Sequence, residues 1–525
     1  MIHIEEIKLK MDGLDSIDLI RQFKHTGFSS IEKDHFALMR WYGIYQQRPN
    51  DGYFMLRIKI GGGQLTAAKL RVISSISHDY GRDLADITTR QNIQLHWVAT
   101  ENLADAIERL QAAGLTTTAA CGDVTRNVVG CPVAGIDAHE ITDTADTLKA
   151  VERRLLGNRL YSNLPRKFKI SVAGCSLDCA QPLINDIGLS AVRHREDPGR
   201  IRFVVCVGGG LSTTPKFAKS LNVLLEEREL PDVCEHICGI FRDYGNRENR
   251  KRARMKFLVE EWGPDKFRDE LEHRLGYSMT PWSDEYIPPK MLDDDHVGIH
   301  PQKQPGLVYV GVPVKAGRTN AQQLAAVAEA SERYGQGRVR LTNHQNIILL
   351  DIPENQVDPL CKDLLQAGLE VNASQTRRLL ITCTGIQFCN LAITETKRVG
   401  VELVERLEKE IPHHEGLRLH MSGCPNSCGQ FQTGDIGMTG VLIPKKGTDE
   451  KTEAYNLFAG GGYGENPAFG RRLILKVPRE NLADMLVKVY RKYAEQRVNG
   501  ETFQPSVHGS RMMNCRRLPK IKGRF

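Results

Sequence analysis

Long apolar runs are missing from this sequence, since none reaches the roughly 18 residues that a membrane-spanning helix needs. The first 15 residues also lack the continuous apolar stretch and the small-residue cleavage site of an export signal. We therefore expect a soluble cytoplasmic protein with no membrane partner. In a chain that is not exported, the 13 cysteines are expected to be reduced thiols, metal ligands or catalytic groups rather than a disulfide framework.

Two recognition patterns are also absent. Basic residues are not interleaved with aromatic ones as they are in single-strand-binding grooves, and the basic tail at 511–525 is expected to be solvated. The glycine triplet at 208–210 lacks the final glycine of a dinucleotide-binding loop. We therefore predict no nucleic-acid partner and no flavin or nicotinamide domain. The mild net charge of +7 favours an acidic partner.

The sequence repeats itself at offsets of 249 to 254 residues. Residues 86–98 recur as 340–352, 106–115 as 360–369, 169–192 as 418–441, and 203–215 as 455–467. Four matches in one order at a nearly constant offset indicate that a unit has been duplicated. The match places Arg90 over His344 and Cys175 over Cys424. The stretch 279–306 is rich in Pro and Asp and is predicted to be a linker.

Each copy begins with a β–α–β pattern. Strands are predicted over 52–60 and 306–314, helices over 67–81 and 321–335, and further strands around Arg90 and His344. The sequence therefore predicts an α+β protein of duplicated α/β half-units with pseudo-twofold symmetry and a cleft for a large ligand. The predicted domains are a first half-domain at 1–135, an α/β domain at 136–278, the linker at 279–306, a second half-domain at 307–375, and a final α/β domain at 376–525.

Four cysteines in the second copy are arranged as C-x5-C and C-x3-C among Gly, Ser, Thr and Asn, namely Cys383, Cys389, Cys424 and Cys428. A structural zinc site usually uses closer pairs, and cysteines that only pack would not be expected in turn-rich segments. A [4Fe-4S] cluster needs four thiolates and backbone N–H groups directed at its sulfurs, which such turns provide. We predict the cluster.

The first copy has thiols at Cys121, Cys131, Cys175 and Cys179. The C-x3-C pair is reproduced, but Cys121 and Cys131 do not reproduce C-x5-C, so we expect a degenerate copy without a working cluster. Cys234 and Cys238 lie four apart in a segment with helical character, and they are expected to be packing residues.

Together these motifs resemble the siroheme-containing nitrite and sulfite reductases. The resemblance covers nearly the whole chain and is based on LPRKFKI at 164–170, TTRQNIQLH at 88–96, both glycine triplets and the two cysteine pairs. It implies three domains with ferredoxin-like half-units around a central site that holds siroheme and a [4Fe-4S] cluster. It further implies that the four cysteines bind the cluster and that Cys428 also bridges to the siroheme iron.

The resemblance also implies site residues by position. The residues implied to act on the substrate are Arg57, Arg126, Lys167 and Lys169. Those implied to contact siroheme are Arg90, Gln94, His96, Gly208, Gly209, Gly210, Gly460, Gly461 and Gly462. Physical chemistry agrees, because siroheme carries carboxylates and the substrate is an oxyanion, so a buried site for either must be cationic.

The implied reaction is the six-electron reduction of sulfite to sulfide, or of nitrite to ammonia, with reduced ferredoxin as the donor. Lysine at both 167 and 169 resembles the sulfite reductases, because plant and cyanobacterial nitrite reductases have asparagine where this chain has Lys169. Segments 297–311 and 383–397 instead resemble the ferredoxin-dependent nitrite reductases. We predict sulfite as the substrate, with nitrite as the alternative, and a monomeric enzyme.

Two other classes stay open. A basic Fe–S or zinc protein that binds nucleic acid would use the thiols only to brace its fold. A dissimilatory sulfite reductase subunit would need a second type of chain for activity.

Overall fold

The computed structural model describes residues 3–176, 178–288, 295–411, 416–445, 447–463, 466–496 and 503–504, so the predicted basic tail lies outside the described residues. The chain divides into two compact units, each described here by itself. The large unit contains Met1–Gly210, Lys216–Val314 and Arg318–Val371, and the small unit contains Leu211–Pro215, Lys315–Gly317 and Asn372–Phe525. None of the helices in the described ranges has both the length and the apolar character needed to cross a membrane.

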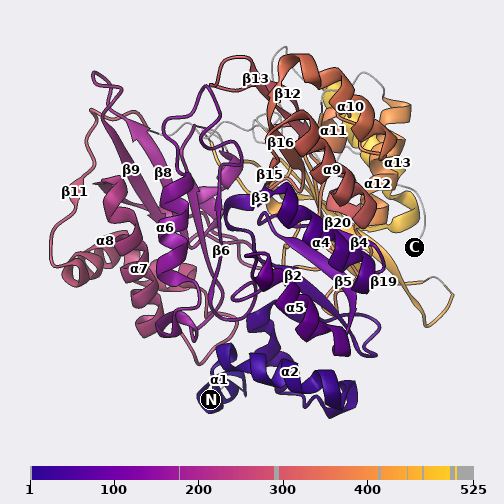
Figure 1. Ribbon diagram of the computed structural model, residues 1–525, viewed down its shortest axis with the longest axis horizontal. Helices are drawn as coiled ribbons and strands as arrows, with labels where there is room; N and C mark the ends of the chain where they lie inside the picture. The colour runs from indigo at the N-terminus through magenta and orange to yellow at the C-terminus, as the bar shows by residue number, and fades with distance from the viewer. Residues whose placement is uncertain are drawn as a thin grey trace. The chain divides into compact units, whose positions relative to one another are not determined.

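Two five-stranded sheets in the large unit come from the β–α–β stretches of the two copies (Figure 1). The first has the order β1 (Ile44–Gln46), β2 (Tyr53–Ile58), β5 (Ile93–Ala99), β4 (Leu84–Ile87) and β14 (Arg318–Asn320). The second has the order β12 (Gly298–Pro301), β13 (Leu307–Val312), β16 (Ile347–Pro353), β15 (Arg338–Leu341) and β3 (Gln64–Thr66). The helices of this part are α1 (His3–Lys10), α2 (Ser16–Thr26), α3 (His35–Leu38), α4 (Ala67–Tyr80), α5 (Leu103–Ala112), α9 (Ala321–Tyr334) and α10 (Val357–Gln366).

Each of these sheets is completed by a strand from the other copy. Strand β14 pairs with β4, where Arg318 lies opposite Asp86, and β3 pairs with β15. The Ser74 hydroxyl of α4 donates to the Ala321 carbonyl at the start of α9, at 2.7 Å. One hydrophobic core includes residues of both copies. The two half-domains therefore fold together, and the exchanged strands cover one edge of each sheet.

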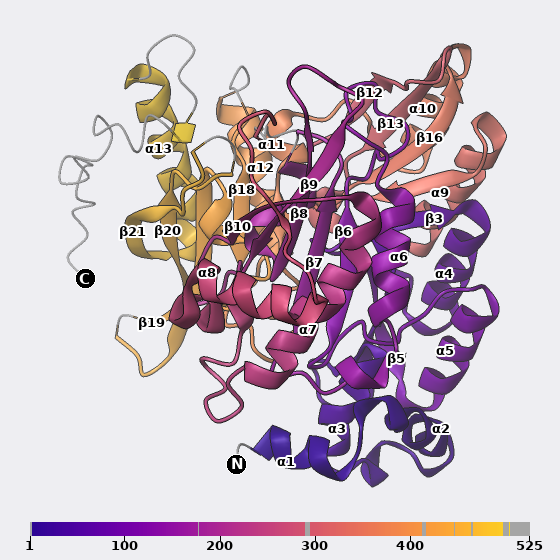
Figure 2. The same cartoon turned by 90° about the vertical axis from the view of Figure 1, so that its left-hand side faces the viewer.

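A six-stranded sheet forms the rest of the large unit (Figure 2). Its order is β11 (Thr280–Pro281), β10 (Lys219–Leu225), β9 (Ile201–Val207), β8 (Ile187–Arg193), β7 (Phe168–Ala173) and β6 (Thr125–Gly130). Strands β6, β7 and β8 are parallel, whereas β8, β9, β10 and β11 are antiparallel. Its core also contains side chains from α6 (Ala145–Leu155), α7 (Leu230–Tyr244) and α8 (Met255–Leu275).

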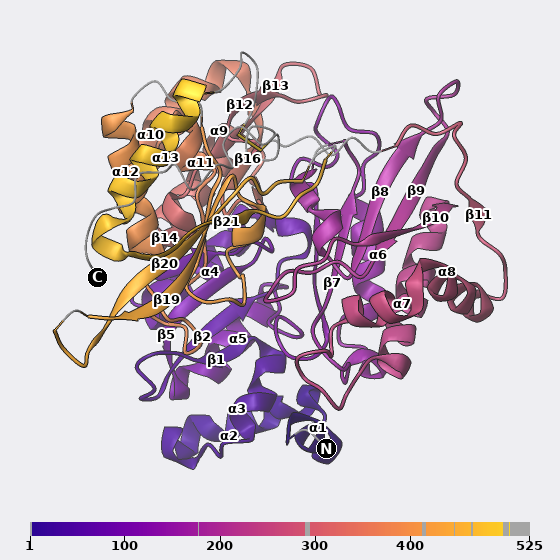
Figure 3. The ribbon, with the colours of Figure 1, turned by 180° about the vertical axis from the view of Figure 1, so that it is seen from behind.

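The small unit contains one five-stranded sheet, whose strands β19, β20 and β21 are labelled in Figure 3. Its order is β17 (Ile381–Thr382), β18 (Leu419–Ser422), β19 (Ile436–Pro444), β20 (Lys451–Ala459) and β21 (Arg471–Pro478). Strands β17 to β19 are parallel, and β19 to β21 are antiparallel. Helices α12 (Lys397–Glu410) and α13 (Leu482–Gln496) share its core, and the short α11 (Gln375–Arg378) precedes β17.

The two α/β sheets share one topology, three parallel strands followed by antiparallel ones, and they also share local hydrogen bonds. The Gly208 N–H donates to the Asp186 carbonyl and the Gly460 N–H to the Asp435 carbonyl, each at 2.9 Å. The duplication and the α+β class predicted from the sequence are therefore confirmed.

The stretches around Arg90 and His344 are hairpins rather than the single strands predicted from their apolar pattern. Residues 88–92 turn between β4 and β5 because the Thr88 hydroxyl accepts the N–H groups of Arg90 and Asn92, at 3.2 and 3.1 Å. Gln91 adopts a left-handed φ of 57° within this turn. The predicted linker also differs from expectation, since β11 and β12 lie inside it and pair with β10 and β13.

Candidate functional site

The predicted substrate residues lie on three strands of the large unit. Arg57 is on β2, Arg126 on β6 and Lys169 on β7, while Lys167 directly precedes β7. Strands β6 and β7 are parallel neighbours at one edge of the six-stranded sheet, so Arg126, Lys167 and Lys169 lie on or just before adjacent strands, whereas Arg57 belongs to the first five-stranded sheet.

Arg57 is in contact with one of the residues predicted to hold siroheme. Its Nη2 donates to Gln94 Oε1 at 3.2 Å, and its Nη1 lies 2.9 Å from Cys121 Sγ. The guanidinium carbon lies 5.7 Å from the centre of the Tyr45 ring. These contacts fix the direction of a half-buried arginine.

Within the described part of the chain, Arg126 and Arg90 are held by backbone carbonyls and an amide rather than by carboxylates. Arg126 donates to the Gly122 carbonyl from Nε at 3.0 Å and from Nη2 at 2.6 Å. Arg90 donates to Asn185 Oδ1 at 2.7 Å and to the Asn127 carbonyl. Burial, reinforced by the charge of Arg126, lowers the pKa of Arg90 to about 9. Its Nε is buried without a hydrogen-bond partner among the described residues.

Lys169 lies among like charges. Its backbone N–H donates to Asp186 Oδ2 at 2.9 Å, and the Asp186 charge offsets only part of the effect of the cations on its ammonium group. Burial is the main cause that holds the Lys169 pKa well below its usual value, followed by the charges of Arg90 and Lys167. A cationic cluster of this kind favours an anionic ligand, because the anion relieves the repulsion and restores the protonated lysine.

Further bases that the sequence interpretation missed join this cluster. Arg254 Nη2 contacts Asp186 at 2.9 Å, and Arg254 Nε is buried without a partner among the described residues. Lys256 Nζ lies 3.4 Å from the Gly210 carbonyl. The available signal was the basic run at 250–256, which extends into the first residues of helix α8. Arg166 belongs to the LPRKFKI motif itself, and burial lowers its pKa to about 10.

A pocket in the large unit opens beside Arg126. Four guanidinium groups contribute to its lining, together with the aromatic rings of Trp41 and Tyr45, and one carboxylate, that of Asp123. The four arginines are Arg40, Arg126, Arg166 and Arg250. A hollow with this balance of charge fits a small oxyanion.

His96 is placed differently from the bases. Its ring is fully buried on β5, where Nε2 lies 3.1 Å from Asp86 Oδ2 and Nδ1 lies 3.4 Å from Gln47 Oε1. Asp86 in turn accepts from Arg318 Nε of the exchanged strand β14, at 2.9 Å. These contacts give His96 a structural part at the strand exchange, and its contact with siroheme stays a prediction.

Lys256 supports a prediction on pH dependence. Burial, followed by the charge of Arg254, lowers its pKa to about 8 from the 10.5 of an unperturbed lysine. Between these two pH values the unfolded chain binds the proton that the folded chain has lost, so folding stability rises with pH. In protein prepared without siroheme, we expect the melting temperature of wild type relative to Lys256→Met to rise from pH 7 to pH 10. Lys219→Met removes an exposed lysine as the control, and an equal trend in both variants would contradict the assignment.

The four predicted cluster thiols come together in the small unit. Cys383 follows β17 and Cys424 follows β18, which are parallel neighbours, and Cys389 and Cys428 lie in the loops after them. Burial raises the pKa of Cys383 to about 12, with Cys428 as the next cause. Burial also raises the pKa of Cys424, where Cys428 and Cys389 add to the effect. Each thiol is thus close enough to its neighbours for their charges to interact.

Backbone donors reach two of these sulfurs, those of Cys383 and Cys424. The Gly423 N–H donates to Cys383 Sγ at 3.2 Å. Backbone N–H groups of Gly385 and Asn426 also lower the pKa values of Cys383 and Cys424, against the larger effect of burial. The predicted N–H groups are therefore present at Cys383 and Cys424.

The first copy keeps three of the four thiol positions. Cys131 directly follows β6 as Cys383 directly follows β17, so Cys131 takes the place of the first cysteine of the C-x5-C pair. The matching hydrogen bonds fix the register: Asp137 N–H donates to Val133 O at 3.1 Å, and Cys389 N–H to Gly385 O at 3.0 Å. Asp137 therefore stands where the second copy has Cys389. Cys121 belongs instead beside Arg57.

The two glycine triplets follow β9 and β20. Gly208 and Gly460 have left-handed φ values of 82° and 77°. A Cβ at Gly209 would lie 2.4 Å from the Leu183 carbonyl oxygen, and one at Gly461 would lie 2.4 Å from that of Gln432. Only glycine fits at these positions, because each triplet packs against the loop that follows a C-x3-C pair. Their contact with siroheme stays a prediction.

Comparison with known proteins adds two family matches that cover most of the chain. Residues 121–279 and 373–503 match the "Nitrite and sulphite reductase 4Fe-4S domain". Residues 45–113 and 300–367 match the "Nitrite/Sulfite reductase ferredoxin-like half domain". Both domains thus occur twice, in the order of the internal repeat.

Relatives with curated names are similar over nearly their whole length. Sulfite reductase (ferredoxin) 1 of Mycolicibacterium paratuberculosis is 38% identical over 95% of this chain and 93% of its own. The assimilatory ferredoxin-dependent nitrite reductase of Haloferax mediterranei is 37% identical over 95% of this chain and 90% of its own. The solved structure of the Mycobacterium tuberculosis NirA protein has a TM-score of 0.91 and 36% identity, over 96% of each chain.

Proposed function

Because this chain belongs to the nitrite and sulfite reductase family, we propose that it reduces sulfite to sulfide with six electrons from reduced ferredoxin. It is an oxidoreductase whose cofactors are siroheme and a [4Fe-4S] cluster. The observation that carries the proposal is the pairing of a four-thiol group with a buried cationic cluster in one chain. Nitrite is the second candidate substrate, since relatives named for either substrate are similar to a nearly equal degree.

The residues present fit these cofactors. The four thiols lie near one another, and the sulfurs of Cys383 and Cys424 accept backbone N–H groups, which suits thiolate ligands of an iron–sulfur cluster. The buried, unpartnered Nε groups of Arg90 and Arg254 suit the carboxylates of siroheme. We infer that Cys383, Cys389, Cys424 and Cys428 hold the cluster, with Cys428 also bridging to the siroheme iron.

When bound, the siroheme and the cluster supply single electrons to a substrate at the iron, which is the chemistry that no side chain can provide. The side chains of this protein position the anion and supply protons. We infer that Arg57 and Arg126 orient the oxyanion and stabilise charge as its oxygens leave. Lys167 and Lys169 would donate protons to those oxygens, for which a lowered lysine pKa is well suited.

The preference for sulfite is inferred from Lys169. Near neutral pH sulfite carries more negative charge than nitrite, so an additional ammonium group favours sulfite more strongly. Its second-copy counterpart, Arg418, is instead neutralised by Asp435 at 2.7 Å. An anion bound beside Lys169 would favour its protonated form, whereas Arg418 already has Asp435 as its counterion.

Absorption spectroscopy of the purified protein tests the cofactor part of the proposal. A siroheme enzyme is expected to show a strong Soret band and red-region bands, with a broad contribution from the cluster. A zinc protein that binds nucleic acid would show neither, and a protein with a bare cluster would show only a broad shoulder. Either of the last two spectra would contradict the proposed activity.

Docking of ferredoxin is expected to depend on salt. The chain carries a net charge of +7, and ferredoxins are acidic, so electrostatic attraction is proposed to bring them together. We expect KM for ferredoxin to rise several-fold between about 0.05 and 0.5 M ionic strength, with kcat changed less. A KM that stays constant across this titration would contradict electrostatic docking.

We further propose that the enzyme acts as a monomer in the cytoplasm, with domain boundaries at 1–135, 136–278, 307–375 and 376–525. The internal repeat supports these boundaries. Because the two half-domains share one hydrophobic core, we expect that proteolysis releases neither of them as a folded unit without the other. Light scattering on a sizing column tests the monomer, and a mass of two chains would contradict it. Limited proteolysis tests the boundaries through the positions of the first cuts.

A further inference from the structure

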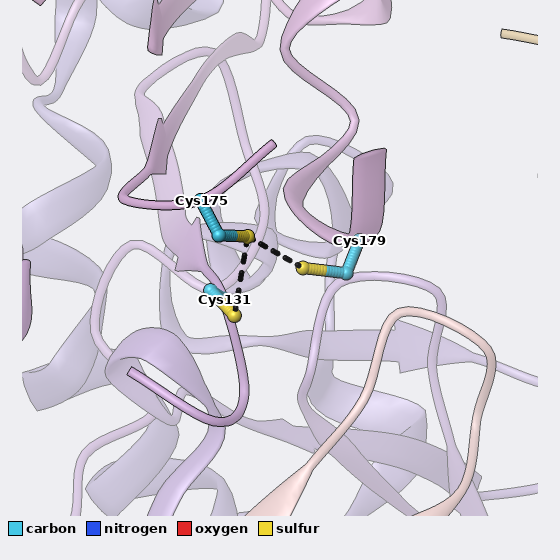
Figure 4. A group of neighbouring side chains, drawn as sticks. All are labelled: Cys131, Cys175 and Cys179. Atoms are coloured by element: carbon cyan, nitrogen blue, oxygen red, sulfur yellow. Dashed lines mark hydrogen bonds between the residues drawn. The ribbon is translucent and has the colours of Figure 1, made fainter. Parts of the chain in front are cut away.

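Three thiols of the first copy converge on one point (Figure 4). Cys131 Sγ lies 3.8 Å from Cys175 Sγ, which lies 4.0 Å from Cys179 Sγ. All three sulfurs are within 4.8 Å of one another. Across the described residues, no other group of three or more Cys, His, Asp or Glu ligand atoms is gathered so closely.

The spacing fits a single metal ion. A tetrahedral zinc with Zn–S bonds of about 2.3 Å holds its sulfurs about 3.8 Å apart. An iron–sulfur cube binds each cysteine to a different iron and so needs wider spacing and a fourth thiol, which Asp137 has replaced. A disulfide needs an S–S distance of about 2.05 Å and would use only two of the three sulfurs.

The surroundings of the three thiols are apolar. Each cysteine is at most 6% exposed, and the same core contains side chains that include Val133, Tyr309 and Ile348. Cysteines buried merely as small hydrophobes need not meet in this way. Cys234 and Cys238 show the contrast, because they are equally buried at the same C-x3-C spacing on α7 and form no such group.

Charge selects the ion. Three thiolates and Zn²⁺ leave one net negative charge, whereas three thiolates and Cu⁺ leave two, which an apolar core disfavours more strongly. We propose that Cys131, Cys175 and Cys179 bind one zinc ion. On binding, each thiol releases its proton to solvent and forms one Zn–S bond, and the fourth position takes a water molecule or another light ligand.

The site has a clear structural role. Cys131 directly follows β6, and Cys175 lies two residues after β7. These parallel strands carry Arg126 and Lys169, so the ion would fix the ends of both strands relative to each other. In this proposal the thiols of the second copy serve electron transfer, and those of the first copy stabilise the fold.

Elemental analysis of the holoenzyme, purified anaerobically with a thiol reductant, tests the site. We expect about one zinc per chain in addition to iron, and less than about 0.1 in Cys175→Ser and Cys179→Ser. Cys234→Ser is the control, because it replaces a thiol that is just as buried but lies outside the group. This variant is expected to keep about one zinc per chain. Iron content and the Soret band report the active-site cofactors separately, so failure of this proposal is distinguishable from failure of the proposed function.

X-ray absorption at the zinc edge of wild-type protein gives a test that needs no variant to fold. Three sulfur neighbours at about 2.3 Å and one lighter neighbour are expected. Wild-type protein without zinc after zinc supplementation would overturn the proposal. So would copper in its place, zinc that persists in Cys175→Ser, or a disulfide among these residues found by mass spectrometry after alkylation.

Discussion

Cys428→Ser is expected to abolish sulfite reduction and to lower the iron content by about four atoms per chain. Serine keeps the size of the side chain but replaces the thiolate that the proposal assigns to both the cluster and the siroheme iron. The Soret band should weaken or shift for the same reason. Iron analysis, absorption spectra and anaerobic activity measure the three effects on one preparation.

Cys361→Ser is the matched control, because Cys361 is half-buried on α10 and lies outside both thiol groups. It should keep the iron content, the spectrum and the activity of wild type. If Cys428→Ser retained the full iron content and an unchanged Soret band, Cys428 would be neither a cluster ligand nor the bridge. Cys383→Ser would then show whether the other thiols hold a cluster without it.

Lys169→Asn is expected to lower kcat/KM for sulfite by about 100-fold and that for nitrite by less than about 10-fold. The variant removes an ammonium group that lies among Arg90, Lys167 and Arg254, and the more highly charged anion loses more from this change. Anaerobic steady-state kinetics with reduced ferredoxin measures both constants. The preference for sulfite should therefore shrink by at least about tenfold.

Lys149→Asn provides the control, since Lys149 is exposed on α6 and changes the net charge by the same amount. An equal loss for both substrates in Lys169→Asn would assign Lys169 to general anion binding. No loss for either substrate would place it outside the active site. In both cases the resemblance of segments 297–311 and 383–397 to nitrite reductases would be the better guide to substrate.

The sequence repeat predicted much of the fold, because duplication leaves matching segments in the same order in both halves. The apolar periodicity of single helices and strands cannot produce such matches. Strands β2 and β13 and helices α4 and α9 lie close to their predicted ranges. The strand exchange between β14 and β4 was not predictable, because three-residue strands carry no period and the pairing joins residues far apart in the chain. Arg90 was placed in a strand because the apolar pattern on both sides hides a turn stabilised by Thr88.

The candidate site was predicted in part. The cysteine spacing indicated the four-thiol group, whose thiols lie near one another in the structure. Arg254 and Lys256 were missed because a basic run at the start of a helix usually indicates a solvated surface. Their burial against Asp186 and Gly210 depends on tertiary packing. The match of Cys131 to Cys383 also required the structure, since an aspartate replaces the cysteine that would have shown the C-x5-C spacing.

The most direct test of the six-electron reaction is a stoichiometric anaerobic turnover with reduced ferredoxin. Sulfite or nitrite is supplied in limiting amount, and oxidised ferredoxin, sulfide and ammonium are measured together. The account predicts about six one-electron ferredoxin oxidations for each sulfide formed and a higher kcat/KM for sulfite than for nitrite. Ferredoxin oxidation that yields neither sulfide nor ammonium would contradict it.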